Sequence, residues 1–334
     1  MNTTLLTTFL LLTVSAAIIY LACEWFVNGI EWIGRKFNMA QTAVGTILAA
    51  VGTALPETVV TFVAVVFGEG EAAKDIGIGA ALGGPLVLST LAYALVGWMV
   101  LKTKNPIKDN SFDQSHLRRD QGWFLAIFLA KIGLGTFIFA FKPWLGIFFI
   151  VAYGIYFLKE LKTTESVEYA DLEPLKLQPR VQEPATLYAI IQTILALTVI
   201  FFASHLFVEQ LTVIGPHLGI SNQAVALLLS PIATELPEIM NAIIWVRQGK
   251  IQLALSNISG SMMIQATVPS ALGIFFTPWI LSAPLLFAGI ITTIAIGYLY
   301  FLMRKDTFTY KKLSYLIFLY GVFVAGIIFI ERFQ

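Results

Sequence analysis

Long apolar stretches separated by short polar connections follow one another along the whole chain. A helix that crosses the hydrocarbon core of a bilayer needs about 20 apolar residues, and this length divides the chain into ten candidate spans. They are expected at about 5–34, 42–68, 76–101, 121–140, 143–161, 186–214, 222–247, 251–275, 279–303 and 312–331. The pattern therefore predicts an all-α membrane protein with ten transmembrane helices.

A single long polar stretch lies between the fifth and sixth spans. It divides the chain into a first five-helix repeat at 1–164, a linker at 165–185 and a second five-helix repeat at 186–334. Lys and Arg concentrate in this linker and in alternate loops, which predicts that the linker is cytoplasmic and that both termini lie outside. Because five is an odd number, the second repeat is expected to be inverted relative to the first.

The composition agrees with a lipid bilayer as the main partner. Of the 334 residues, 57% are hydrophobic and only 12% are charged, whereas soluble domains carry about 25% charged residues. A net charge of +1 without a basic block gives no sign of nucleic-acid binding. Cys23 is the single cysteine, which excludes an intrachain disulfide. It ends a stretch similar to a lipoprotein cleavage site, but no Lys or Arg precedes it, so a retained first helix is predicted.

Two segments of the chain carry closely similar sequences. Residues 52–57 read GTALPE, and 181 positions later residues 233–238 read ATELPE. The same shift aligns 22–57 with 203–238 without a gap and pairs further identical residues. Chance similarity between apolar helices would match Leu, Val and Ile, but here Thr, Pro and Glu also match. The alignment therefore favours an internal repeat.

Each copy places a glutamate beside a proline in apolar surroundings. A carboxylate in hydrocarbon costs about 2.5 kcal/mol or more unless it lines a polar cavity or meets a cation. Pro56 and Pro237 each free a backbone carbonyl one turn earlier, so both helices are expected to break beside Glu57 and Glu238. Carbonyl, hydroxyl and carboxylate oxygens suit hard cations such as Ca²⁺, Na⁺ and Mg²⁺. The two glutamates are expected to face each other across a central ion site; a purely structural capping role is the alternative.

These segments resemble the alpha repeats of the calcium/cation antiporter superfamily, which includes sodium/calcium and proton/calcium exchangers. In that family a G-T-S-L-P-E-like motif precedes a G-N-x-x-G-S-N-x-x-[ND]-like motif; here 79–88 and 256–265 occupy the second position. The resemblance covers most of the chain. It implies a secondary antiporter, not an enzyme, that exchanges Ca²⁺ or a similar divalent cation for Na⁺ or H⁺ by alternating access, without a cofactor.

The resemblance also implies ion ligands, with clear departures from the family pattern. By position, the ligands are Thr53, Glu57, Thr234, Glu238, Ser261 and Gln265, with the backbone carbonyls of Ala50 and Pro231. Gly84 and Leu88 stand where the third span of the family offers oxygen-bearing side chains. Ala54 replaces a serine, and Glu235 replaces the counterpart serine and adds a carboxylate. Glu235 is either a further ligand, a cap of a half-helix or the partner of a cation.

Several questions stay open at this level. Neighbouring carboxylates in a low-dielectric site can take up protons, so proton coupling stands beside sodium coupling. Transport of Mg²⁺ or Mn²⁺ and a non-transporting cation sensor are alternatives, and the oligomeric state is unknown. Compact loops favour a bacterial inner membrane. Glu24 and His205, at equivalent repeat positions, are expected to be buried and hydrogen-bonded, and a role as proton relay is the alternative. Lys131 in the fourth span is expected to snorkel toward water, and neutralisation of a carboxylate is the alternative.

Overall fold

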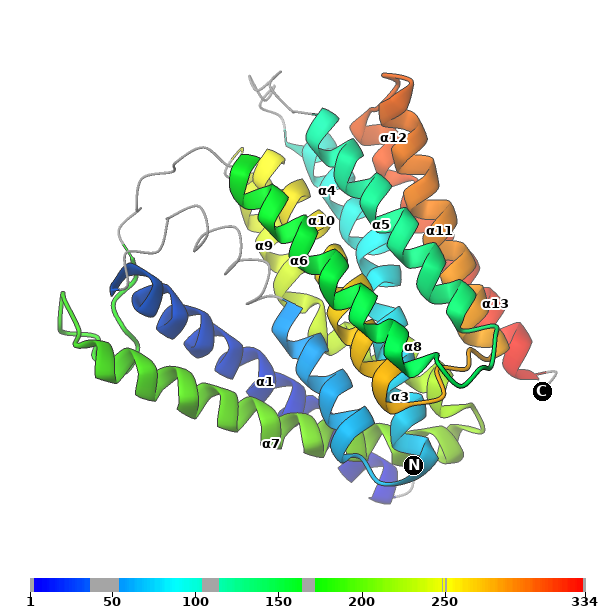
Figure 1. The fold of residues 1–334 in the computed structure, drawn as a ribbon, viewed down its shortest axis with the longest axis horizontal. Coiled ribbons are helices and arrows are strands. Elements are labelled where there is room, and N and C mark those ends of the chain that lie inside the picture. The colour runs from blue at the N-terminus through cyan, green and yellow to red at the C-terminus, as the bar shows by residue number, and fades with distance from the viewer. Residues whose placement is uncertain are drawn as a thin grey trace.

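The computed structural model describes residues 3–36, 54–103, 114–163, 172–247, 249 and 251–332 (Figure 1). All regular elements within these ranges are helices. The α-helices are α1 (Thr3–Lys36), α3 (Gly70–Val87), α4 (Tyr93–Lys102), α5 (Gln114–Leu134), α6 (Gly146–Thr163), α7 (Thr186–Leu218), α8 (Asn222–Thr234), α9 (Leu236–Arg247), α10 (Ile251–Phe276), α11 (Ala283–Arg304), α12 (Tyr310–Ser314) and α13 (Leu316–Arg332). A further apolar helix, Ala54–Phe67, ends in the π-helical turn η1 (Val63–Phe67). A second π-helical turn, η2 (Leu88–Ala92), joins α3 to α4, and the 3₁₀ turn η3 (Pro143–Leu145) precedes α6.

Six of the described helical segments are long and apolar enough to cross a bilayer. They are Leu5–Lys36, Gly70–Lys102, Thr186–Leu218, Ile251–Phe276, Ala283–Arg304 and Tyr310–Arg332. Their outer faces expose large apolar side chains, such as Phe202 and Phe329, as expected for contact with lipid. The chain is an all-helical, multi-pass integral membrane protein. The count of ten crossings stays a prediction.

The helix in the fourth expected span is shifted toward the N-terminus. The sequence pattern predicts 121–140, whereas α5 covers Gln114–Leu134. Gly133 and Gly135 have low helix propensity, and the chain turns after them. Lys142 stabilises this turn, since its Nζ donates to the carbonyls of Phe137 at 2.7 Å and Trp279 at 2.9 Å. The predicted span starts within α5 but continues past its end, because it followed the apolar run through this turn.

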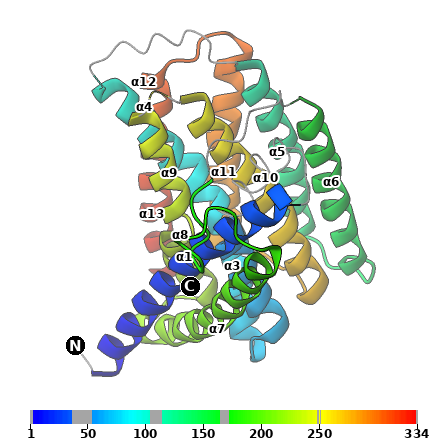
Figure 2. The ribbon, with the colours of Figure 1, turned by 90° about the vertical axis from the view of Figure 1, so that its left-hand side faces the viewer.

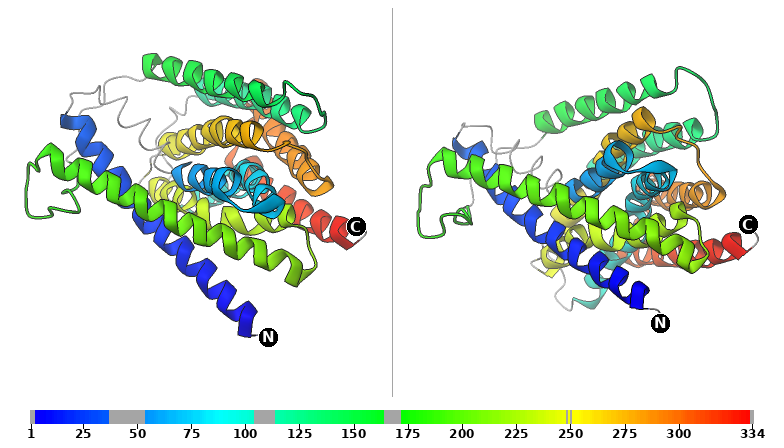
Figure 3. Two further views of the ribbon diagram at one scale, coloured as in Figure 1. Left: turned by 60° about the horizontal axis from the view of Figure 1, so that its bottom comes forward. Right: turned by 90° about the horizontal axis from the view of Figure 1, so that it is seen from below.

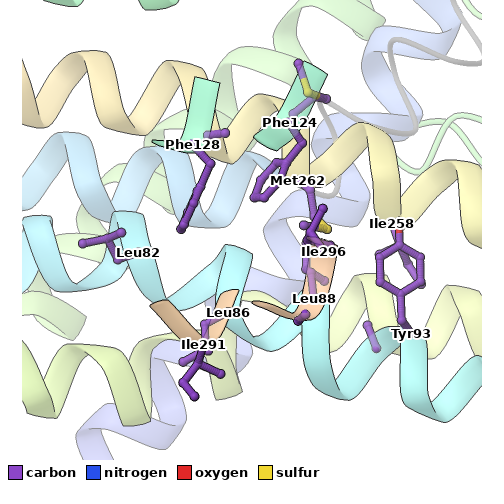
Figure 4. Packing of buried hydrophobic residues seen from close by; sticks show 14 of the residues in the cluster. Leu82, Leu86, Leu88, Tyr93, Phe124, Phe128, Ile258, Met262, Ile291 and Ile296 are labelled. Atoms are coloured by element: carbon purple, nitrogen blue, oxygen red, sulfur yellow. The ribbon is translucent and has the colours of Figure 1, made fainter. Parts of the chain in front are cut away.

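The two largest apolar cores of the described residues join most of the helices. The larger core joins α3 to α5, α10, α11 and α13, and Figure 4 shows part of it around Leu82, Phe128 and Ile291. The smaller core joins α1 and α7 to the helix Ala54–Phe67, α3 and α8. Helix α3 contributes to both cores and lies at the centre of the molecule. Side chains on α3 therefore meet residues from both halves of the chain.

Helix α3 approaches α8 of the second half closely because it carries glycines four residues apart. A Cβ atom at Gly79 would lie 2.6 Å from Cβ of Ala226, and one at Gly83 would lie 2.6 Å from Cγ of Pro231. Small residues at this spacing let two membrane helices pack backbone to backbone. Figure 2 shows α8 and α9 running beside α3 and α4. This approach brings α3 next to the break between α8 and α9.

Helices α1 and α7 form a long pair on one side of the molecule (Figures 1 and 3). Their contact depends on Gly29, where an added Cβ would lie 2.5 Å from Oγ1 of Thr193 and 3.3 Å from the Ala189 carbonyl. Thr193 itself donates to that carbonyl at 2.9 Å. No side chain larger than hydrogen fits between the two helices at this point.

The variant Gly29→Leu is therefore expected to separate α1 from α7 and to lower the stability of the protein by about 1–3 kcal/mol. Thermal unfolding of the purified protein in detergent measures the effect. Gly154→Leu on α6 is the matched control, because a Cβ at Gly154 meets nothing within 4 Å. An equal loss of stability in both variants would contradict this role of Gly29.

The described part of the linker, residues 172–185, is held against α1 and α7. Asn28 donates to the carbonyls of Glu173 and Pro174 and accepts from the backbone N–H of Lys176 at 3.0 Å. Leu175 is fully buried beside Trp32 and Ala189. The linker is thus a defined structural element within this range, although its predicted cytoplasmic position is untested.

The two polar residues at equivalent positions of α1 and α7 are not buried. Glu24 is 43% exposed and pairs with Lys176 of the linker at 3.0 Å, and His205 is 41% exposed and lies 3.5 Å from Glu209. The expectation that they are buried was wrong, although Glu24 accepts a hydrogen bond from Lys176. The α1–α7 contact uses other faces of these helices, so both side chains point to the outside of the pair.

Candidate ion-binding site

The seventh predicted span is broken at Glu235. Helix α8 ends at Thr234 and α9 begins at Leu236, while Glu235 has φ −96° and ψ −4°. Its backbone N–H donates to the carbonyl of Pro231 at 2.9 Å. Pro237 cannot donate a backbone hydrogen bond, so it permits the new helix start at this point. The break predicted beside Glu238 is present.

The break predicted beside Glu57 in the first half would fall at the edge of the described residues. The helix Ala54–Phe67 begins where residues 37–53 end, and these residues lie outside the described part of the chain. Thr53 and Ala50, both expected as ligands, are therefore not described. Glu57 lies in the first turn of the described helix and is fully buried.

Glu57 meets the second half of the chain through Thr234. The Thr234 hydroxyl lies 2.5 Å from Oε2 of Glu57, 3.1 Å from the carbonyl of Ser230 and 3.3 Å from Oε1 of Glu235. Thr234 and both carboxylates are buried. One hydroxyl hydrogen serves only one of these three acceptors at a time. Thr234 thus lies between a carboxylate of each half.

Glu235 is oriented into this cluster by Gln265 of α10. The side-chain amide of Gln265 donates to Oε1 of Glu235 at 2.9 Å and to Oε2 at 3.0 Å. Both side chains occupy the space in front of Gly84 on α3, where an added Cβ would lie 2.7 Å from each Oε1. The missing side chain at Gly84 is thus matched by a larger side chain at Glu235. The two departures from the family pattern belong together.

The other expected ligands are buried on neighbouring elements. Glu238 on α9 and Ser261 on α10 are both fully buried. Pro231 is buried on α8, and its carbonyl, which accepts from Glu235, keeps a second lone pair. The structure thus brings Glu57, Thr234, Glu235 and Gln265 into hydrogen-bonding contact. The direct opposition of Glu57 and Glu238 stays a prediction.

The cluster offers oxygen atoms of several chemical types. Among the described residues, Oε1 of Glu57, Oγ of Ser230 and Oε1 of Gln265 are buried and accept no hydrogen bond. Buried polar atoms without a partner are costly, and a hard cation would satisfy such oxygens. No three Asp, Glu, His or Cys side chains gather as a metal-binding group within the described part of the chain. A cation here would therefore need hydroxyl, amide and carbonyl oxygens as well as carboxylates.

Ser230 escaped the sequence analysis, although a signal for it was present. It lies four residues before Thr234 on α8, and residues four apart share one face of a helix. A search for hydroxyl residues one turn from the motif would have found it.

Lys131 lies inside the protein and does not reach toward water. It is fully buried, and its Nζ donates to the carbonyl of Ala81 and to Oγ of Ser270, each at 3.0 Å. The expectation that it snorkels was wrong. Pro85 has no N–H for the carbonyl of Ala81, one turn earlier, and Lys131 supplies the missing donor. The sequence contained this proline but not the distance between α3 and α5.

Comparison with known proteins places this geometry in context. The model of the family described as "Sodium/calcium exchanger protein" matches residues 7–159 and 188–329. The inner membrane protein YrbG of Escherichia coli (strain K12) is 24% identical over 273 residues, covering 80% of this chain and 79% of that protein.

Two solved structures share the fold. A structure of the sodium-calcium exchanger NCX_Mj is 20% identical, with a TM-score of 0.60 and coverage of 96% of this chain and 99% of that chain. A structure of the H⁺/Ca²⁺ exchanger CAX is 17% identical, with a TM-score of 0.71 and coverage of 97% of this chain and 88% of that chain. At these identities the likeness concerns the fold alone.

Proposed function

The chain belongs to the sodium/calcium exchanger protein family, and on that premise we propose that it exchanges Ca²⁺, or a similar divalent cation, for Na⁺ or H⁺. Membership makes it a membrane cation exchanger and not an enzyme. The observation that carries the choice of ion is the contact of Glu57 with Thr234 beside Glu235. It joins acidic oxygens from both halves inside the protein, where a divalent cation balances two charges at once.

The proposed ligands come from four segments around this contact. They are Thr53, Glu57, Thr234, Glu235, Glu238, Ser261 and Gln265, with the backbone carbonyls of Ala50 and Pro231. The mixture of carboxylate, hydroxyl, amide and carbonyl oxygens is typical of Ca²⁺ sites. The break at Glu235 supports it, because transporters bind ions at discontinuous helices.

Charge explains how the two fluxes would be coupled. Buried carboxylates without a cation are costly in a low-dielectric environment. The binding site would therefore pass between its two accessible states only when it carries a divalent cation or its monovalent replacements. The α1–α7 pair is the proposed moving element, since it packs as a unit against the helices of the site. The cytoplasmic linker, the external termini and a bacterial inner membrane location complete the proposal; the name of YrbG supports the last point.

Ca²⁺ uptake into proteoliposomes tests the proposal and identifies the counter-ion. We expect uptake only when an outward gradient of Na⁺ or of H⁺ is imposed, and the gradient that drives it names the partner ion. Excess Mg²⁺ or Mn²⁺ should compete weakly if Ca²⁺ is the substrate. Binding of Ca²⁺ without flux under either gradient would indicate a sensor and contradict the proposal.

A further inference from the structure

A buried lysine contacts two of the helices that surround the proposed ion site. Lys131 of α5 reaches the carbonyl of Ala81 on α3 and the hydroxyl of Ser270 on α10. Both helices also contribute to the site, α3 through Gly84 and α10 through Gln265. Lys131 is therefore hydrogen-bonded to two helices that surround the site, although it is not one of the proposed ligands.

The contacts of the Lys131 Nζ atom are two hydrogen-bond acceptors and one aromatic ring. Ser270 donates its own hydrogen to the carbonyl of Gln265 at 3.2 Å, so its oxygen is available only as an acceptor. The Ala81 carbonyl is an acceptor as well. The Phe128 ring centroid lies 4.7 Å from Nζ, and an aromatic face attracts a cation; Figure 4 shows this ring in the core. All three neighbours can stabilise a positive charge on Nζ, and none of them donates a hydrogen bond to a neutral amine.

Charges in the membrane core must be counted together, because Coulomb interactions act over long distances in a low dielectric. Glu57, Glu235 and Glu238 carry three negative charges when ionised, and all three are fully buried. Lys131 is also fully buried, and when charged it interacts electrostatically with Glu57. The three carboxylates and the charged lysine together carry a net charge of minus two.

The remaining buried charges of the described residues belong to other places. Asp120 lies near the start of α5, with Arg119 at 3.7 Å and His116 at 3.5 Å. It is eleven residues before Lys131, which corresponds to about 16 Å along a helix. Lys142 closes the turn after α5. The charges of Asp120 and Lys142 are opposite in sign, so they leave the net charge of the buried residues unchanged.

We propose that Lys131 is a resident cation of the exchange cycle, so that the site carries one divalent cation in one direction and two monovalent cations in the other without net charge movement. This inference rests on the proposed cation exchange. Without Lys131, three carboxylates would call for three monovalent cations, and each cycle would move one net charge. Lys131 thus sets the stoichiometry.

Transport under imposed membrane voltage tests the proposal on the full-length protein. In proteoliposomes with potassium gradients and valinomycin, wild-type Ca²⁺ exchange is expected to be the same at inside-negative and inside-positive potentials. A tenfold gradient of the monovalent ion should hold an about hundredfold Ca²⁺ gradient at equilibrium, since each tenfold step has the same free energy. Voltage-dependent wild-type exchange would overturn the assignment while leaving the exchange function intact.

The variant Lys131→Gln keeps a hydrogen-bond donor but removes the charge. Its exchange is expected to become voltage-dependent, and the same tenfold monovalent gradient should hold an about thousandfold Ca²⁺ gradient at zero voltage. Ser270→Ala is the matched control: it removes one hydrogen bond of Lys131 and keeps the charge, so slower exchange with unchanged stoichiometry is expected.

Each outcome decides the proposal. Electroneutral exchange by folded Lys131→Gln protein would reduce Lys131 to a structural donor for the backbone at Pro85. If this variant does not fold, the wild-type voltage measurement decides alone. Absence of wild-type Ca²⁺ flux under every gradient would remove the proposed function, and the role of Lys131 would fall with it.

Discussion

Replacing Glu57 with Gln is expected to abolish Ca²⁺ exchange. The amide is nearly the same size as the carboxylate and still accepts the hydrogen bond from Thr234, so the change removes mainly the charge. Loss of one partner of a buried charge pair costs about 2–5 kcal/mol, which is a factor of about 30 to several thousand in affinity. The same reasoning applies to Glu238→Gln, because Glu238 is also fully buried.

Initial rates of radioactive Ca²⁺ uptake in proteoliposomes, together with Ca²⁺ binding in detergent, measure this effect. Glu209→Gln is the matched control, since Glu209 is 59% exposed on α7 beside His205. The control should retain near wild-type flux. Near-normal flux in both Glu57→Gln and Glu238→Gln would show that the ion does not bind between the two halves.

Much of this arrangement follows from local sequence patterns. Apolar runs of the right length predicted helices that the structure confirms, such as α10 and α11 within a few residues of the expected ranges. The Pro237 pattern predicted the break that occurs at Glu235. These features depend only on residues close together in the sequence: apolar runs long enough to cross a bilayer, and a proline that lacks the backbone N–H.

The features that escaped prediction depend on distances between helices. The burial of Lys131 follows from the close packing of α5 against α3 and α10. The exposure of Glu24 and His205 follows from the face that α1 presents to α7 at Gly29. The apolar pattern of the sequence predicts each helix, but it does not predict which face of one helix packs against which face of another. Helix ends such as that of α5 were missed because an apolar turn resembles an apolar helix.

The pairing of Gly84 with Glu235 gives a second prediction with a large effect. Gly84→Ala places a methyl group 2.7 Å from Oε1 of Glu235 and 2.7 Å from Oε1 of Gln265. Both atoms are ends of flexible side chains, so they can move, and overpacking of this kind costs about 1–3 kcal/mol of stability. Transport should suffer more, because the movement displaces two proposed ligands together. We expect Ca²⁺ exchange to fall at least about tenfold, the effect of 1.4 kcal/mol on binding.

A double substitution shows whether the two positions compensate for each other. Gly84→Ser with Glu235→Ser returns both positions to the residues that the family resemblance implies, and it removes the large carboxylate side chain that a hydroxymethyl group on α3 would displace. In thermal unfolding, the double variant should be more stable than Gly84→Ser alone, and a double-mutant cycle measures the coupling free energy between the two positions. Gly321→Ala on α13 is the control, because a Cβ there meets nothing within 4 Å. Simple additivity of the two substitutions would mean that Gly84 and Glu235 act independently and do not compensate for each other.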